Sequence, residues 1–158
     1  MTRNMKAVLN SVLLVSTLCL TSTVFAAANM KGQLSNLSDH VGKGQWTIVV
    51  AWHSKCGACK KSIPKLVSAK GSFPNAKLIG VSLDGKWSKA QQIMSRYNIN
   101  FPTLLTNIKG FDQYVRRVAK KPLVGAPTYL IFDPKGKLQA MQSGVISPAE
   151  LKKYISKH

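Results

Sequence analysis

The feature that most constrains this chain is a pair of closely spaced cysteines directly after an apolar segment. Gln45–Trp52 is rich in β-branched and aromatic residues, which suits a central strand covered on both faces. Cys56 and Cys59 follow it, and the sequence from about residue 57 to residue 69 is expected to be helical. A buried strand that leads into a helix predicts an α/β architecture, with the cysteines at the junction.

This junction gives the two cysteines different chemical roles. The first N–H groups of a helix lack carbonyl partners and its N-terminal end is electropositive, so the thiolate of Cys56 is favoured over the thiol. The two-residue gap places Cys59 one helical turn later, within reach for a disulfide. We therefore expect Cys56 to be the attacking nucleophile and Cys59 to resolve the mixed disulfide that it forms.

The same cysteine spacing also occurs in one half of a zinc or iron–sulfur site. A second half is missing, because the other candidate ligands, His40, His53 and His158, do not stand in paired ligand spacing. The sequence therefore favours redox chemistry and predicts no metal and no dissociable cofactor. A copper(I) metallochaperone that uses the same two thiols is an alternative, since thiolates suit this soft ion.

The beginning of the chain has the layout of an export signal. Two basic residues precede the largely apolar segment 7–20, and a cleavage-like site follows at Val24–Ala26. We predict that residues 1–26 form a signal peptide and that residues 27–158 form one domain of common size. An uncleaved anchor is disfavoured because the apolar segment is shorter than the roughly 20 residues that a spanning helix needs. The expected location is periplasmic or otherwise extracytoplasmic, in a bacterial type of cell.

The chain is strongly basic, with 23 Lys and Arg against 5 Asp and Glu and a formal net charge of +18. Such charge favours acidic partner proteins or an anionic membrane surface, and it raises encounter rates more than affinity. Nucleic acid is not an expected partner, because the sequence has no binding motif and no interleaving of aromatic and basic residues. The alternative explanation of this charge is that the lysines are simply solvated on the exposed faces of helices and bind no partner.

The middle of the chain alternates between strand and helix patterns. Residues 77–83 predict a second buried strand, and Ser88 is expected to cap the helix that follows it. A short apolar stretch after Phe101 then leads to another helix. One face of that helix is expected to carry Phe111, Tyr114, Val115 and Val118.

The last part of the chain predicts a hairpin and a helix. Thr128–Phe132 and residues 137–143 are expected to pair as strands around a tight turn. Ser147 and Glu150 have the spacing of a capping box, with Pro148 at the first helical position, so a helix should follow. The order of elements predicts a central mixed β-sheet flanked by helices on both faces.

Residues 52–66, WHSKCGACKKSIPKL, resemble the active-site segment of the thioredoxin superfamily, especially its exported TlpA/ResA-like branch. The resemblance continues across nearly all of residues 27–158. Ile99–Pro102 is similar to the extra segment of this branch, Val124–Thr128 to its cis-proline loop, and Phe132–Lys137 to the hairpin that follows. It implies a thioredoxin-like fold, and it is far more specific than the cysteine spacing alone.

The resemblance also implies which residues bind a substrate. Pro127 should follow a cis peptide bond and lie beside the cysteines. The backbone of Ala126 would then be free to pair with an extended substrate strand. Trp52 matches the first of two tryptophans that precede the site, where it would pack under the loop, and we assign it to substrate binding together with Ala126 and Pro127.

Three positions depart from the family's pattern. Lys55 stands in place of the second tryptophan, Val50 in place of a buried Asp, and Ser62 where some members have a helix Glu. Without a nearby carboxylate and with basic neighbours, the pKa of Cys56 is expected to be lowered, which makes the disulfide a stronger oxidant. His53 is interpreted as a surface residue near the loop; the alternative is that it shares a proton with Cys59.

The sequence therefore predicts a thiol-disulfide oxidoreductase that acts on client proteins with cysteine pairs and exchanges electrons with a membrane or soluble redox partner. The resemblance implies a reductant, as in cytochrome c or copper-oxidase assembly. The basic surroundings of Cys56 favour an oxidant or isomerase of the same fold instead. A peroxide-reducing enzyme is a further alternative, because the segment Phe101–Pro102 also occurs in peroxiredoxin-like folds.

Overall fold

The computed structural model describes residues 34–158. The predicted signal peptide, residues 1–26, and the start of the predicted domain at residue 27 lie outside the described residues. In the described range, no helix combines the length and the apolar character that a membrane span requires.

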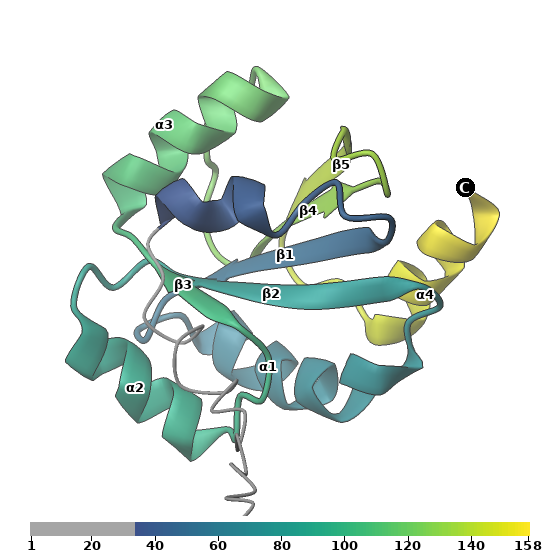
Figure 1. The fold of residues 1–158 in the computed structure, drawn as a ribbon. Coiled ribbons are helices and arrows are strands. Elements are labelled where there is room, and N and C mark those ends of the chain that lie inside the picture. The colour runs from purple at the N-terminus through teal and green to yellow at the C-terminus, as the bar shows by residue number, and fades with distance from the viewer. Residues whose placement is uncertain (1–33) are drawn as a thin grey trace, which may run out of the picture.

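A five-stranded sheet forms the centre of the molecule, with the strand order β3-β2-β1-β4-β5 (Figure 1). β1 is parallel to β2 and β2 to β3, whereas β4 is antiparallel to both β1 and β5. The mixed sheet predicted from the sequence is therefore confirmed. The strands are β1 Trp46–Trp52, β2 Ala76–Ser82, β3 Thr103–Leu105, β4 Thr128–Phe132 and β5 Leu138–Ser143.

β1 is the central strand, and all of its residues are buried. Its side chains alternate between the two faces of the sheet, as the pleat requires. Val50 and Trp52 belong to one core cluster, and Val49 and Ala51 belong to the other. Burial on both faces explains why the segment is a continuous apolar run and has no polar–apolar alternation.

Helices cover both faces of the sheet (Figure 1). α1 (Gly57–Ala69), α2 (Trp87–Arg96) and α4 (Pro148–Lys157) pack on the face that carries Val50 and Trp52. α3 (Ile108–Ala119) and a short 3-10 helix (Leu34–Asp39) pack on the opposite face. The buried anchors are Ile63 and Leu66 of α1, Ile93 of α2, Leu151 and Ile155 of α4, and Phe111 and Val115 of α3.

Two sequence predictions need correction. Thr103–Leu105 was predicted only as a short apolar stretch before a helix, but it forms the edge strand β3, because a parallel partner is available at Gly80–Ser82 of β2. Ser88 was expected to be a cap, but α2 begins at Trp87 and its N-cap is Lys86, which makes no side-chain capping bond. Ser88 lies inside the first turn of the helix.

The start of α4 has the predicted capping box. The N–H of Glu150 donates to the Ser147 hydroxyl, and the Ser147 N–H donates to the Glu150 carboxylate at 2.8 Å. Pro148 occupies the first turn, where its missing N–H costs no helical bond.

The topology brings two distant segments together at one edge of the sheet. β1 ends there and passes into α1, while the antiparallel β4 begins there, so Ala51 is paired with Thr128. The loop before β4 therefore lies beside the loop that joins β1 to α1. These two loops form the site described next.

Candidate active site

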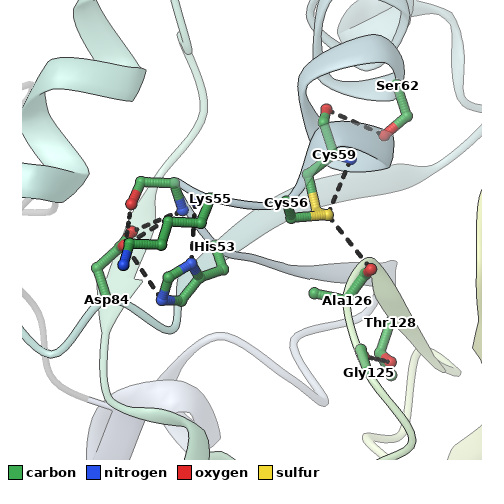
Figure 2. The surroundings of a disulfide bond; sticks show 10 residues. His53, Lys55, Cys56, Cys59, Ser62, Asp84, Gly125, Ala126 and Thr128 are labelled. Carbon is green, nitrogen blue, oxygen red and sulfur yellow. Dashed lines mark hydrogen bonds and ion pairs between the residues drawn. A yellow bond between two sulfur atoms is a disulfide. The ribbon is translucent and has the colours of Figure 1, made fainter.

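Cys56 is the N-cap residue of α1, with extended backbone angles (φ −79°, ψ 109°). Its sulfur occupies the place of a capping oxygen and accepts the backbone N–H of Cys59 at 3.0 Å. The two cysteines form a disulfide, with their Cα atoms 5.2 Å apart (Figure 2). A hydrogen bond and a helix N-terminus directed at one sulfur both favour its anionic form once the disulfide is reduced.

The two sulfur-bearing residues differ in their access to solvent. Cys56 is half-buried at the start of the helix. Cys59 is completely buried and belongs to the core cluster with Ile63 and Val50. Only Cys56 is therefore placed for contact with another molecule.

The loop before β4 lies against Cys56. The peptide bond between Ala126 and Pro127 is cis, as the family resemblance implied. The carbonyl oxygen of Ala126 is 3.3 Å from the Cys56 sulfur (Figure 2). Three hydrogen bonds hold this loop: the Thr128 hydroxyl donates to the Gly125 carbonyl (2.6 Å), the Gly144 N–H to the Pro127 carbonyl (2.8 Å), and the Leu123 N–H to the Asp112 carboxylate (2.8 Å).

Ala126 keeps an unused donor beside the cysteines. Among residues 34–158, its backbone N–H has no hydrogen-bond partner. The residue is half-buried, so a segment of another chain that reaches Cys56 can also reach this N–H. Pro127 itself is buried and fixes the direction of the loop.

Trp52 does not fit the substrate-binding role that the sequence suggested. Its side chain is completely buried, in the core cluster that also contains Phe101 and Ile63. A residue without exposed surface cannot contact a client protein. Trp52 supports the loop from beneath, and the assignment to substrate binding is wrong.

Asp84 anchors the loop between β1 and α1, and the sequence analysis missed it. Its side chain is fully buried and accepts the Ser54 N–H at 3.1 Å and 3.2 Å, the Ser54 hydroxyl, and the Ser82 hydroxyl at 2.9 Å. The signal was present in the sequence, because Asp84 follows β2, and the carboxyl ends of parallel strands meet at one sheet edge. The expectation that no carboxylate lies near the site is therefore wrong.

His53 belongs to the same anchor. Its Nδ1 accepts the backbone N–H of Lys55 at 3.0 Å, and its Nε2 lies 3.5 Å from Asp84. The side chain is 25% exposed, and Figure 2 shows it on the Asp84 side of the loop, away from the two sulfur atoms. This arrangement supports a role in holding the loop and gives no contact with Cys59.

The surroundings of the site are basic. Lys55, Lys60 and Lys61 lie on the loop and the first part of α1, and Lys120 and Lys121 precede the cis-proline loop. Within the described part of the chain, none of these lysines forms an ion pair with a carboxylate. The same part of the chain holds no group of three or more His, Cys, Asp or Glu residues arranged around a metal ion.

Comparison with known proteins gives consistent matches. Residues 21–141 match the model of the AhpC/TSA family. Sporulation thiol-disulfide oxidoreductase A of Bacillus subtilis (strain 168) is 26% identical over 118 residues, which cover 71% of this chain and 67% of that protein.

Solved structures show the same fold. The thioredoxin domain of a thiol-disulfide oxidoreductase from Bacteroides vulgatus superposes with a TM-score of 0.62 at 22% identity, covering 77% of this chain and 82% of that one. A secreted Mycobacterium tuberculosis disulfide oxidoreductase homologous to E. coli DsbE has a TM-score of 0.57 at 18% identity, covering 73% and 84%.

The loop anchor predicts a specific effect on stability. Replacing Asp84 with Ala leaves the half-buried Ser54 N–H without its acceptor, so the free energy of unfolding should fall by about 2 kcal/mol. Urea denaturation of the oxidised protein measures it. Asp39→Ala is the matched control, because Asp39 is exposed and makes no side-chain hydrogen bond in the described residues, and it should change stability by less than about 0.5 kcal/mol. Equal stability of the two variants would contradict the anchor.

Proposed function

The chain belongs to the AhpC/TSA family within the thioredoxin superfamily and is a thiol-disulfide oxidoreductase, and on this premise we propose that it reduces disulfides in client proteins outside the cytoplasm. Cys56 is the nucleophile and Cys59 the resolving residue. The observation that carries this assignment is the asymmetry of the pair: the Cys56 sulfur accepts a helix N–H and is partly exposed, whereas Cys59 is completely buried.

The reaction consists of two thiol-disulfide exchanges. The Cys56 thiolate attacks one sulfur of the client disulfide, and the other client sulfur leaves with the bonding electron pair and takes up a proton. Cys59, as thiolate, then attacks Cys56 in the mixed disulfide, and the second client sulfur leaves. The client gains two electrons, and the protein is left with the Cys56–Cys59 disulfide. A membrane or soluble redox protein must return the two electrons.

The cis-proline loop offers a docking edge for the client. An extended segment can accept the unpartnered N–H of Ala126 while its cysteine lies against Cys56. Exposed apolar side chains flank this edge, since Val124 is 82% and Val145 is 53% exposed. Both lie on loops joined to the cis-proline segment, one before it in sequence and one through the Gly144–Pro127 hydrogen bond.

The charge around the site favours clients with acidic residues near the reactive cysteine. Lys55 lies on the loop before Cys56, Lys60 and Lys61 lie on the first part of α1, and Lys120 and Lys121 lie a few residues before the cis-proline. The carboxylates of the described residues that contact these two segments are already engaged: Asp84 is buried and bound to Ser54 and Ser82, and Asp112 is bound to Arg116 and the Leu123 N–H. An acidic client segment, or a client at an anionic membrane surface, would be steered towards Cys56.

The location outside the cytoplasm rests on the leader-like residues 1–26 and on relatives. One structural relative is described as secreted, and it is homologous to E. coli DsbE. The resemblance to the TlpA/ResA-like branch further favours a reductive role, in which cysteines are kept reduced during assembly of proteins such as cytochrome c.

The first prediction concerns trapping of the intermediate. Reduced Cys59→Ser protein should accumulate a stable mixed disulfide at Cys56 with a disulfide-bonded peptide, because the resolving thiol is missing. An acidic peptide should be captured a few-fold faster than its lysine-substituted counterpart at low salt, and the difference should shrink as salt is added. Mass spectrometry under non-reducing conditions measures both.

Matched variants sharpen this experiment. Lys121→Glu should reduce the preference for the acidic peptide. Lys153→Glu should not, because its neighbour Tyr154 packs on Trp46 at the opposite end of β1. Cys56→Ser should trap nothing. Capture through Cys59 in that variant would contradict the assignment of the nucleophile.

The second prediction concerns the direction of electron flow. A reductant should have a reduction potential close to that of thioredoxin, about −270 mV, whereas an oxidant of the DsbA type lies near −120 mV. Equilibration with glutathione buffers, followed by quantification of the Cys56–Cys59 disulfide, measures the potential. A value near that of DsbA would reject the reductive role and leave the thiol-disulfide exchange itself intact.

A further inference from the structure

An open hollow lies next to the cis-proline loop, and the exchange reaction described above does not use it. Its volume is about 270 Å³. One wall is formed by the segment between α3 and β4, and the other by the end of β5 (Figure 1). The residues that line it are Lys121, Pro122, Val124, Met141 and Ser143.

The strand register places this hollow at the same edge of the sheet as the cysteines. Ser143 is the partner of Thr128, the first residue of β4, which pairs with β1 near the end of that strand. The Thr128 hydroxyl lies 2.9 Å from the Ser143 hydroxyl and donates to the Gly125 carbonyl. These contacts join the hollow to the loop whose Ala126 carbonyl lies 3.3 Å from the Cys56 sulfur (Figure 2).

The backbone beside the hollow offers hydrogen bonds to an extended segment. Among residues 34–158, the N–H groups of Val124, Gly125 and Ala126 have no acceptor. Val124 and Gly125 are exposed, and Ala126 is half-buried. When an extended segment pairs with such a chain, the hydrogen bonds hold its backbone and pockets for its side chains determine specificity.

The distance along the loop indicates which client residue reaches the hollow. Val124 lies two residues before Ala126, and two residues of extended chain span about 7 Å. Side chains two residues apart also point the same way along an extended segment. If the client cysteine lies beside Ala126, the client residue two positions away lies beside Val124 and the hollow.

The lining of the hollow combines apolar surface with one positive charge. Met141 is half-buried and packs against the core cluster on the α3 face of the sheet, and Pro122 and Val124 add further apolar surface. Lys121 is exposed and forms no ion pair with a carboxylate of the described residues. A side chain with an apolar stem and a carboxylate at its end matches this lining.

The segment that carries Lys121 is held against α3. The Leu123 N–H donates to the Asp112 carboxylate at 2.8 Å, and the same carboxylate accepts the Arg116 Nε–H at 2.8 Å. Asp112 is therefore engaged by two donors on its own side of the segment. The backbone next to Lys121 keeps its position without using the charge of the lysine.

We propose that this hollow is a side-chain subsite for a glutamate two residues from the reactive cysteine of the client. This inference rests on the proposed exchange reaction. The methylene groups of the glutamate lie against Val124 and Met141, and its carboxylate pairs with the Lys121 ammonium. An aspartate has one methylene group fewer, and a glutamine lacks the charge. Lys121 and Met141 therefore determine specificity and take no part in the transfer of electrons.

The test uses reduced, unmodified protein and short peptides with one cysteine, which is joined by a disulfide to 2-nitro-5-thiobenzoate. Cys56 attacks the peptide sulfur, and the coloured thiobenzoate leaves with the electron pair of the broken bond, because the thiol of lower pKa is the better leaving group. Stopped-flow absorbance measures this release. Each rate is divided by the rate of the same peptide with dithiothreitol, which corrects for the reactivity of the peptide itself.

The peptides carry glutamate or glutamine either two residues before or two residues after the cysteine. At one of these positions, glutamate should react about threefold faster than glutamine, which is the size expected for an exposed ion pair. The other position should show a clearly smaller difference, because the hollow lies on one side of the cysteine only. Attraction to the basic surface as a whole acts on both positions and cancels in this comparison. Aspartate and leucine at the preferred position should react more slowly than glutamate.

Matched variants assign the preference to the hollow. Lys121→Met keeps an apolar stem and removes the charge, so it should abolish the preference, and Lys121→Arg should retain most of it. Lys55→Met is the control, because it removes the same charge from the loop before Cys56 and should leave the positional preference unchanged.

The outcomes separate the two proposals. The subsite is overturned, and the exchange reaction still stands, if glutamate is favoured equally at the two positions, if leucine reacts faster than glutamate, or if Lys121→Met keeps the preference. A loss in Lys55→Met as large as that in Lys121→Met overturns it too. Failure of every peptide to release thiobenzoate from the reduced protein instead contradicts the proposed function itself.

Discussion

The hydrogen bond from the Cys59 N–H to the Cys56 sulfur is the interaction on which the site depends. It exists because Cys56 takes the N-cap position of α1, where a helix normally receives a side-chain acceptor. The position of that helix is fixed in turn by β1, which is buried on both faces and ends immediately before the loop. A central strand, a helix start and two residues of spacing together create one half-buried, stabilised cysteine and one completely buried cysteine.

The rest of the architecture holds two loops in fixed positions beside that sulfur. Antiparallel pairing of β4 with β1 places Ala126 beside Cys56, and Asp84 at the end of β2 ties down the loop that precedes it. Neither loop is rigid through its own sequence alone. Their fixed positions come from contacts with the three central strands, which suits the proposed binding of client segments without rearrangement of the nucleophile.

Local patterns in the sequence predicted most of the fold and the cysteine pair. Some features depend only on residues that are close together in the sequence, so they could be predicted without a structure. These are the apolar run of β1, the capping box at Ser147 and the turn before β5. β3 was missed because three residues carry too little pattern and become a strand only through pairing with β2. Asp84 was missed because its importance lies in its contact with Ser54, which is distant in sequence. Trp52 was assigned correctly to the site's surroundings, but only the burial seen in the structure excludes contact with a client.

The central claim is that the sulfur of Cys56, and not that of Cys59, is the ionised nucleophile at the start of α1. The most direct measurement is the rate of alkylation of the reduced protein by iodoacetamide as a function of pH, with peptide mapping to locate the modified cysteine. The account predicts modification of Cys56 first, with a midpoint below the ordinary thiol value of about 8.5. Modification of Cys59 at an equal rate, or a Cys56 midpoint at or above that value, would contradict it.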